Sequence, residues 1–368
     1  MMFMDNMSLQ YLTATRRKLH ALAELSGAEY KTCEFIASEL KRFGYKPKTV
    51  GTGLFCDAGR GKDRLAFRAD IDALPMIENT AVTGMGDCCG TGAMHACGHD
   101  GHTANLLNVA RIVGCDSKIP LRFIFQFDEE VAGGSTVMIE NGALDDVDEI
   151  YALHLCPEIE IGKIGYCYGA MFSGCCEFNV NVAGKSCHCA DGQNGADAVK
   201  ASVNIATQAY ESANKHGLLI NLGKIVGGAA RNIVAGDCKS EYTLRFYDMA
   251  KCESVLLDIE RAAEKCDDEY RTSHGIESVA VYPPVINHAM CVDNVRKAMG
   301  ERCVEVPARY TAEDFANYLL RVPGCMVWLG TRSEGHTSPL HSDTFSFEER
   351  ALENGTELFI KLIQSRTA

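Results

Sequence analysis

The middle of the chain, from residue 175 to residue 284, carries strand and helix patterns in the order β-α-β-β-α-β. Strand patterns occur at 177–182, 218–226, 239–247 and 277–282. Apolar residues at helical spacing predict helices at 196–214 and 252–266. This order is that of the split βαβ sandwich, a compact module that closes on itself. We therefore expect residues 175–284 to form a separate α+β domain.

The segments on either side of this module alternate between helix and strand patterns, which is typical of a sheet layered with helices. Before the module, strands are predicted at 65–71, 121–127 and 149–155, with helices at 11–25, 30–43 and 103–113. After it, the patterns predict helices at 292–299 and 312–320, a strand at 325–329 and a long final helix after Phe345. We expect residues 1–174 and 285–368 to share one core, forming an α/β domain into which the module is inserted.

Composition disfavours several classes of partner. The 368 residues carry a formal net charge of −13, which argues against binding to nucleic acid or to an anionic membrane. No apolar run approaches the roughly 20 residues that span a bilayer, and the first 25 residues lack a signal-peptide pattern. The 18 cysteines are too sparse for a disulfide-built scaffold, so we expect reduced thiols in a cytoplasmic protein.

Residues 94–102 concentrate three histidines and a cysteine directly before a predicted helix. Imidazole and thiolate suit borderline-soft divalent ions. Because a core histidine usually stands alone, the segment favours metal binding over a structural role. An alternative is that Cys97 is a nucleophile activated by a neighbouring histidine. That alternative leaves the carboxylates described next without a role.

Carboxylates follow two of the predicted buried strands. Strand 121–127 runs into Asp128-Glu129-Glu130, and strand 65–71 includes Asp70 and is followed by Asp72. One carboxylate of the first set could bind a metal ion while its neighbour takes a proton from water. Asp70 and Asp72 face the same way on an extended chain and could orient a metal-binding histidine. The alternatives are a solvated loop and an ordinary turn, respectively.

Two isolated histidines could complete the set. His154 lies at the end of predicted strand 149–155, and His341 lies in the segment 338–342. A lone histidine is more often a hydrogen-bonded structural residue. Each therefore gains weight only if it converges with the other candidate ligands.

Together these segments resemble the aminoacylase and carboxypeptidase family of co-catalytic metallopeptidases. The resemblance is carried by residues 67–76, 94–102 and 125–130, by His154 and by Leu340-His341-Ser342, and it runs nearly the length of the chain. The motif Cys97-Gly98-His99-Asp100 is similar to that of the amidohydrolase branch. That branch holds indoleacetyl-amino-acid hydrolases, hippurate hydrolases and N-acetyl-diaminopimelate deacetylases. The resemblance implies a catalytic domain with a mixed sheet and flanking helices, and an inserted lid that also mediates dimerisation.

The resemblance also implies the roles of the site residues. Two divalent metal ions, which could be zinc, manganese, cobalt or nickel, would be bound by Cys97, His99, Glu130, His154 and His341. Glu129 would be the general base that takes a proton from the water held between the metals and passes it to the leaving amine. Asp70 and Asp72 would support the site.

In the inserted module the resemblance implies three further residues. His188 would reach an active site, often that of the partner subunit, to stabilise the tetrahedral oxyanion. Asn232 and Arg245 would help to hold the substrate. An arginine suits a free carboxylate because its guanidinium is a planar bidentate donor. Judged alone, Arg245 could equally form a surface ion pair.

A few positions depart from the usual pattern of the family. Phe127-Asp128 stands where Pro-Ala is frequent, and Asp343 stands where proline often follows the histidine and serine. Gly192 and Ala235-Gly236 differ in the lid. These differences leave the implied metal ligands and base intact and bear on substrate identity.

The function expected is hydrolysis of the amide bond of an N-acyl amino acid, a small-molecule substrate, by a homodimer. A metallo-exopeptidase or dipeptidase would use the same chemistry and is the main alternative. A non-catalytic binding protein on the same fold is less favoured, because it would need no proton acceptor such as Glu129 beside its metals.

Overall fold

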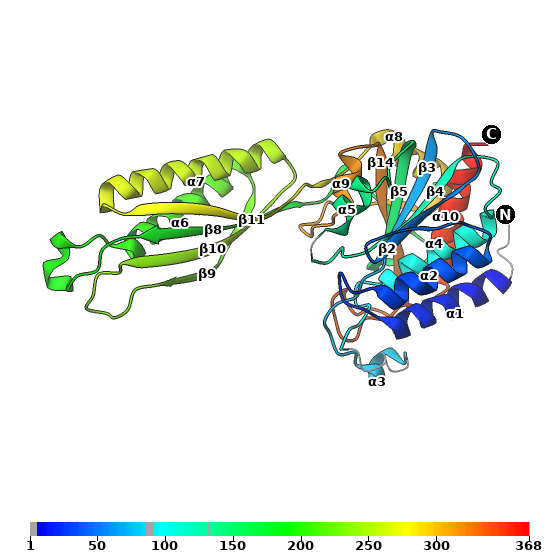
Figure 1. The fold of residues 1–368 in the computed structure, drawn as a ribbon, viewed down its shortest axis with the longest axis horizontal. Coiled ribbons are helices and arrows are strands. Elements are labelled where there is room, and N and C mark those ends of the chain that lie inside the picture. Colours follow the sequence, from blue (N-terminus) through cyan, green and yellow to red (C-terminus); the bar gives the residue numbers. More distant parts are fainter. Residues whose placement is uncertain (1–5, 86–91, 132, 368) are drawn as a thin grey trace. The chain divides into compact units, whose positions relative to one another are not determined.

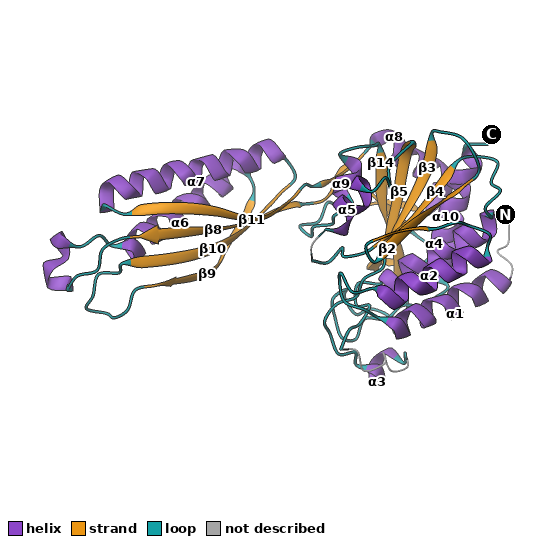
Figure 2. Cartoon of the chain, viewed as in Figure 1, coloured by secondary structure: helices purple, strands orange, loops and turns teal. Residues whose placement is uncertain are grey.

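The computed structural model describes residues 6–85, 92–131 and 133–367 (Figure 1). The chain divides into two compact units. Unit 1 comprises Met1–Met171, Val285–Ala308 and Asp314–Ala368, and unit 2 comprises Phe172–Pro284 and Arg309–Glu313. Each unit combines a sheet with helices (Figure 2).

The sheet of unit 1 has eight strands. In spatial order they are β1 (Lys48–Val50), β2 (Gly53–Ala58), β4 (Leu121–Gln126), β3 (Arg64–Asp70), β5 (Val147–Glu160), β14 (Gly324–Arg332), β6 (Ile164–Tyr166) and β13 (Cys303–Glu305). The four central strands β4, β3, β5 and β14 are parallel, whereas β2 and β6 pair antiparallel with them. Every residue of β4 is buried, as expected of a parallel strand covered on both faces.

The helices of unit 1 pack on this sheet and on one another. Helix α4 (His99–Val113) contacts α1 (Asn6–Leu22), α2 (Tyr30–Arg42) and α10 (Ala351–Ser365), and α10 contacts α8 (Ala289–Met299). The shorter helices are α3 (Thr80–Thr83), α5 (Gly134–Glu140) and α9 (Ala316–Leu319). Aromatic rings join the layers, since the ring of Phe67 on β3 lies 6.3 Å from Phe123 on β4 and 4.6 Å from Phe359 on α10. A short two-stranded sheet pairs β7 (Gly169–Phe172) with β12 (Val285–Asn287).

Unit 2 is an antiparallel sheet with two helices. Its strands, in spatial order, are β11 (Ser273–Tyr282), β8 (Gly174–Ala183), β10 (Asp237–Phe246) and β9 (Leu219–Gly227). Helices α6 (Ala198–His216) and α7 (Met249–Tyr270) share its core, and a short 3₁₀ helix, η1, spans Cys189–Asn194. Asp197 and Asp248 cap the two long helices through their side chains.

The α/β class predicted from the sequence is confirmed, and two local expectations need correction. Helix α4 begins at His99, so His99 and His102 lie in its first turn and not before it. Gly98 allows this early start because its φ of 89° lies in the left-handed region. The helix expected at 312–320 is reduced to Ala316–Leu319.

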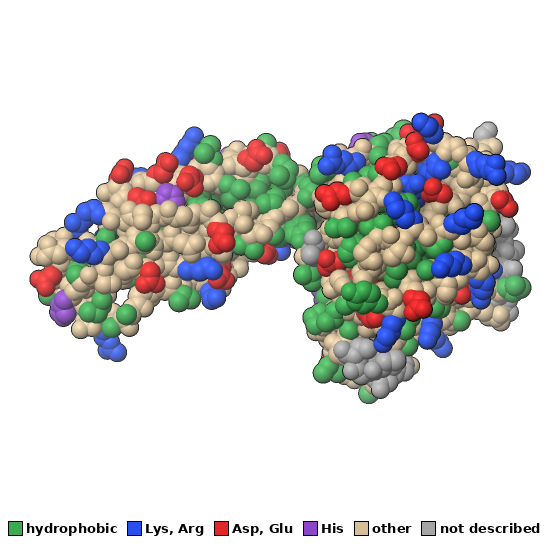
Figure 3. Space-filling view, in the orientation of Figure 1, with side chains coloured by type: hydrophobic (Ala, Val, Ile, Leu, Met, Phe, Trp, Pro, Cys, Tyr) green, Lys and Arg blue, Asp and Glu red, His purple; other side chains and the backbone are tan. Residues whose placement is uncertain are grey.

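Charged side chains of both signs intermingle on the face shown in Figure 3. None of the helices in the described part of the chain combines the length and the apolar character that a membrane span requires.

His274 on β11 joins that strand to α7 within unit 2. Its Nδ1 lies 2.7 Å from Asp267 Oδ2 and its Nε2 lies 3.1 Å from Glu260 Oε1. Burial opposes protonation of the ring, but the two carboxylates outweigh burial and raise the pKa of His274. The fold therefore stabilises the protonated ring.

We predict that His274→Gln lowers the melting temperature of unit 2 more at pH 6 than at pH 9. A histidine whose pKa rises on folding contributes stability that is complete below its unfolded pKa of about 6.5 and is lost as the pH rises through the folded pKa. Differential scanning calorimetry at both pH values measures the difference. His216→Gln is the control, because His216 faces one carboxylate, Asp258, at 3.7 Å. An equal effect of His274→Gln at both pH values would contradict the prediction.

Candidate metal centre

The polar residues of the site lie at one edge of the parallel strands. Asp70 ends β3 and is paired with Gln126, which ends β4. Because parallel strands end at the same edge, the loops that follow them meet there. Asp72 follows β3 and the pair Glu129-Glu130 follows β4, while His154 lies within β5. This arrangement brings segments from distant parts of the chain to one place.

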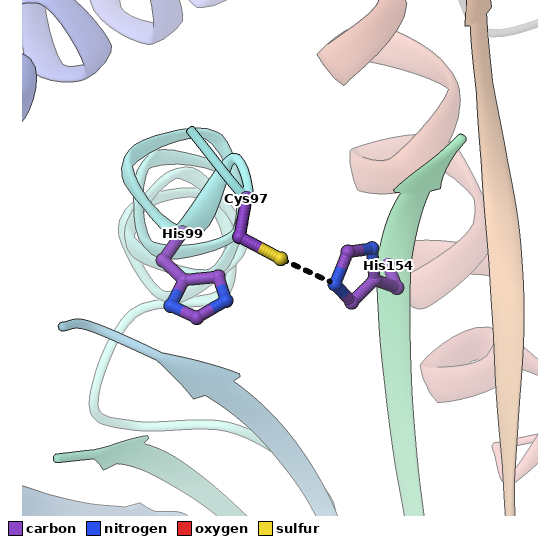
Figure 4. A group of neighbouring side chains, drawn as sticks. All are labelled: Cys97, His99 and His154. Atoms are coloured by element: carbon purple, nitrogen blue, oxygen red, sulfur yellow. Dashed lines mark hydrogen bonds between the residues drawn. The ribbon is translucent and has the colours of Figure 1, made fainter. Parts of the chain in front are cut away.

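Cys97 lies in the turn before α4, and His99 is the first residue of that helix; Cys97 points toward His154 on β5 (Figure 4). A side chain at Gly98 would bring its Cβ within 2.7 Å of Leu155 Cδ1, so glycine is needed there for space as well as for its positive φ. His341 arrives after β14, and its backbone N–H donates to Ala96 O at 2.9 Å. His341 also has a φ of 60°, which is uncommon for a residue other than glycine.

The five candidate ligands converge. Cys97 Sγ lies 3.3 Å from His154 Nε2 and 3.2 Å from His341 Nε2. Three overlapping sets of ligand atoms each lie within 4.8 Å of one another: Cys97, His99 and His154; Cys97, Glu130 and His341; and His99, Glu129 and Glu130. Overlapping sets of this kind suit neighbouring cations.

Two ligand atoms of these three sets are buried without a hydrogen-bond partner among the described residues. They are His99 Nε2 and Glu130 Oε1, which lie 3.8 Å apart. Leaving buried polar atoms unpaired is costly, so this pair calls for a ligand between them. Sulfur, nitrogen and oxygen donors together fit zinc and other first-row divalent ions. The residues present therefore fit bound divalent metal.

The electrostatics of the site also favour a cation. Burial alone would lower the pKa of His99, but the carboxylates of Asp70, Asp72 and Glu130 raise it to about 10. Burial and nearby carboxylates raise the pKa of the Cys97 thiol, so a thiolate here needs a cation beside it. The alternative in which Cys97 acts as a histidine-activated nucleophile is therefore disfavoured.

Asp72 orients two of the candidate ligands. Its Oδ1 accepts a hydrogen bond from His99 Nδ1 at 3.0 Å, and its Oδ2 accepts one from the backbone N–H of Glu130 at 3.0 Å. Ser26 Oγ donates to the same Oδ2 at 2.7 Å. Because Nδ1 of His99 is engaged in this way, its Nε2 is left to face the site.

His102 belongs to the same motif but is fully engaged elsewhere. Its Nδ1 lies 2.6 Å from Asp70 Oδ1, and its Nε2 accepts a hydrogen bond from the backbone N–H of Leu155 at 3.0 Å. Asp70 also accepts a hydrogen bond from Arg68 Nη1 at 2.7 Å. Burial raises the proton affinity of Asp70, but His99, His102 and Arg68 outweigh this and hold its pKa well below the usual range. His102 and Arg68 thus stabilise the ionised Asp70 carboxylate beside the candidate ligands.

In unit 2 the structure brings two of the three sequence-predicted residues together. His188 pairs with Ile233, and the backbone N–H of Cys189 donates to Asn232 O at 2.9 Å. Arg245 lies elsewhere, eight residues along β10 from Asp237, or roughly 26 Å of extended strand. Its Nη1 is buried without a hydrogen-bond partner in the described part of the chain.

Sequence reasoning missed several residues that hold the site. Arg16, His20, Ser26, Glu29 and Arg68 are buried or hydrogen-bonded around it. The one local signal that could have found Arg68 is a charged residue inside an otherwise apolar predicted strand. The others lie on the first helix or in the loop that follows it, where polar residues are ordinary.

Glu129 is a partly exposed carboxylate beside the candidate ligands at the carboxyl edge of the parallel strands, an arrangement typical of metallohydrolases. The family follows from comparison with known proteins. The chain belongs to peptidase family M20/M25/M40, whose sequence profile matches residues 66–365. The family resemblance inferred from the motifs is thereby confirmed.

Individual relatives cover nearly the whole chain. N-acetyl-L-cysteine deacetylase of Bacillus subtilis (strain 168) is 34% identical over 356 residues, which cover 93% of this chain and 84% of the relative. N-acetyldiaminopimelate deacetylase of Lactobacillus acidophilus is 31% identical over 380 residues, which cover 96% and 97%. Among solved structures, the YXEP protein of Bacillus subtilis, a dinuclear metal-binding peptidase of the M20 family, matches with a TM-score of 0.84, 28% identity and 98% coverage of both chains.

We predict that His99→Gln lowers the divalent metal content of the purified protein, whereas His95→Gln does not. His99 Nε2 faces the cluster, while His95 lies in the same motif and is equally buried but joins none of the ligand sets found among the described residues. Inductively coupled plasma mass spectrometry after dialysis gives the metal content per subunit. Equal metal content in the His99 variant and the wild type would contradict the assignment.

Proposed function

We propose that this chain hydrolyses the amide bond of N-acyl amino acids. The observation that carries the proposal is the convergence of five candidate ligands, with Glu129 beside them. We propose that two divalent ions are held by Cys97, His99, Glu130, His154 and His341. Zinc and manganese are our first candidates, with cobalt and nickel as alternatives, because this mixed ligand set accommodates them all. The relatives named as deacetylases of N-acetyl-L-cysteine and N-acetyldiaminopimelate support the substrate class.

We assign the proton transfers to Glu129. The metal ions, when bound, supply Lewis-acid chemistry that acidifies water and polarises the scissile carbonyl. The Glu129 carboxylate, within 4.8 Å of the ligand atoms of His99 and Glu130, takes a proton from the attacking water. It then delivers that proton to the amide nitrogen as the carbon–nitrogen bond breaks, so that the amine leaves uncharged. Asp72 keeps His99 and Glu130 oriented while this happens.

We propose that residues 175–284 act as a lid and dimerisation domain. His188 accepts a hydrogen bond from the backbone N–H of Ala190 at its Nδ1, so Nε2 carries the proton and can donate to an oxyanion. The unpartnered Nη1 of Arg245 suits the substrate carboxylate. Asn232, which lies beside His188, would add a polar contact at the site that His188 serves. Since roughly 26 Å of β10 separates Arg245 from the end next to His188, we propose that the two serve different active sites of a homodimer.

We also propose that the enzyme works in the cytoplasm. Every cysteine that the structure describes is a free thiol. A reducing compartment keeps thiols in this state.

We predict that Glu129→Gln lowers kcat by about 10²-fold to 10⁴-fold, the usual contribution of general base catalysis, without changing metal content. The amide keeps the size of the side chain but cannot accept the proton. Hydrolysis of N-acetyl amino acids, hippurate and dipeptides, with and without chelator, measures both the loss and the substrate preference. Full activity of the variant would mean that the base is misassigned, and faster turnover of dipeptides would favour the exopeptidase alternative.

We predict that coexpressed Glu129→Gln and His188→Ala subunits regain activity that neither has alone. If His188 acts on the partner's substrate, each hybrid dimer has one intact site, and random pairing gives about one quarter of wild-type activity. The control replaces the second subunit with a Glu129→Gln/His188→Ala double variant, which leaves every pairing without a base. An inactive mixture that still forms dimers would place His188 in its own subunit's site.

A further inference from the structure

The connection between α1 and α2, residues 23–29, runs along the candidate metal centre. Leu25 pairs with Ala73 as an isolated parallel bridge, and the backbone N–H of Ala73 donates to Glu24 O at 2.9 Å. Ser26 donates to Asp72, as described above. This connection therefore touches the loop that follows β3 at several points.

Glu29, at the end of this connection, is a fully buried carboxylate with 0% exposure. Its Oε1 accepts hydrogen bonds from the backbone N–H of Gly27 at 3.0 Å and from that of Asp128 at 2.8 Å. Its Oε2 accepts one from the hydroxyl of Thr52. Glu29 belongs to none of the ligand sets found among the described residues, so its contacts point to a role other than metal binding.

Asp128, which Glu29 holds, directly precedes the proposed base. Its φ of 55° is uncommon for a residue other than glycine, so this backbone conformation must be maintained by its surroundings. Its carbonyl accepts a hydrogen bond from Gly134 N at 2.8 Å. A Cβ at Gly134 would come within 1.9 Å of Phe127 O, so the backbone at Gly134 packs closely against that of Phe127.

The residues on either side of Glu129 each donate their backbone N–H to a buried carboxylate. The N–H of Asp128 donates to Glu29, and the N–H of Glu130 donates to Asp72. Asp72 is also tied to the candidate ligand His99, whereas Glu29 is tied to Gly27 and Thr52. The backbone after Glu129 is therefore held by a carboxylate that also contacts a candidate metal ligand. The backbone before Glu129 is held by Glu29, whose other hydrogen bonds go to Gly27 and Thr52.

We propose that Glu29 is a positioning residue that fixes the Glu129 carboxylate through the backbone of Asp128. This inference rests on the proposed function, because it assumes that Glu129 is the base. Glu29 acts by geometry, since its oxygens accept hydrogen bonds and touch no reacting atom. A shift of about 1 Å in a catalytic group can cost about 10²-fold in rate.

The test compares substitutions at Glu29 for turnover of an N-acetyl amino acid. Glu29→Ala should lower kcat by about 10²-fold with unchanged KM and metal content. Glu29→Gln should stay within a few-fold of wild type, because its amide oxygen can accept from both backbone N–H groups and its NH₂ can donate to Thr52. The matched control is Glu24→Ala, which removes a carboxylate of the same connection that, among the described residues, accepts hydrogen bonds only from the backbone N–H and hydroxyl of Thr32, at 2.9 and 3.0 Å. It should keep the wild-type kcat.

A double variant separates positioning from a general structural effect. Glu29→Ala/Glu129→Gln should be no slower than Glu129→Gln alone, because the position of the base is immaterial once the base is removed. A further loss of about 10²-fold in the double variant, or wild-type kcat in Glu29→Ala, would overturn the inference. If Glu29→Ala does not fold, Glu29→Asp, whose carboxylate is withdrawn by one methylene, replaces it in both comparisons. A fully active Glu129→Gln would instead refute the proposed base, so the two failures are distinguishable.

Discussion

The hydrogen bonds of the Asp72 carboxylate join the parts of the site that come from different places in the chain. A buried carboxylate is stable only when its oxygens are well supplied with donors. Here the donors are the ring of His99, the backbone of Glu130 and the hydroxyl of Ser26. One buried group thereby fixes the start of α4, the loop after β4 and the connection between α1 and α2. The remaining geometry of the centre depends on this junction.

Asp72 is one of several carboxylates that make the centre attractive to cations, as the net charge of −13 makes the chain as a whole. Asp70, Asp72 and Glu130 surround His99 and favour positive charge at its ring. Arg68 balances part of this charge through hydrogen bonds to Asp70 and Asp314. The unpaired atoms of His99 and Glu130 nevertheless remain, and a divalent ion would satisfy both. Metal binding and the stability of the site are therefore coupled.

Unit 2 has a hydrophobic core of its own, because its antiparallel sheet packs against helices on one face. Its length along β10 keeps Arg245 far from the segments that carry His188 and Asn232. Asn232 and Arg245, which the sequence resemblance assigns to substrate binding, thus lie at separate ends of this unit. That separation, a consequence of strand geometry, is the reason for dividing them between two active sites in the proposed dimer.

The sequence by itself determined the α/β class, the strand-end carboxylates and the segment 94–102, because alternating apolar patterns and clustered ligand types are local signals. It also located the candidate ligands His154 and His341, through resemblance. Only the tertiary structure decided which histidines face the centre: His99 and His102 share one helical turn, yet Leu155 and Asp70 engage both nitrogens of His102. The contact of Glu29 with Asp128 was equally hidden, since it joins residues 99 positions apart. Burial and hydrogen-bond partners arise from the packing of distant segments, and a local pattern carries no record of that packing.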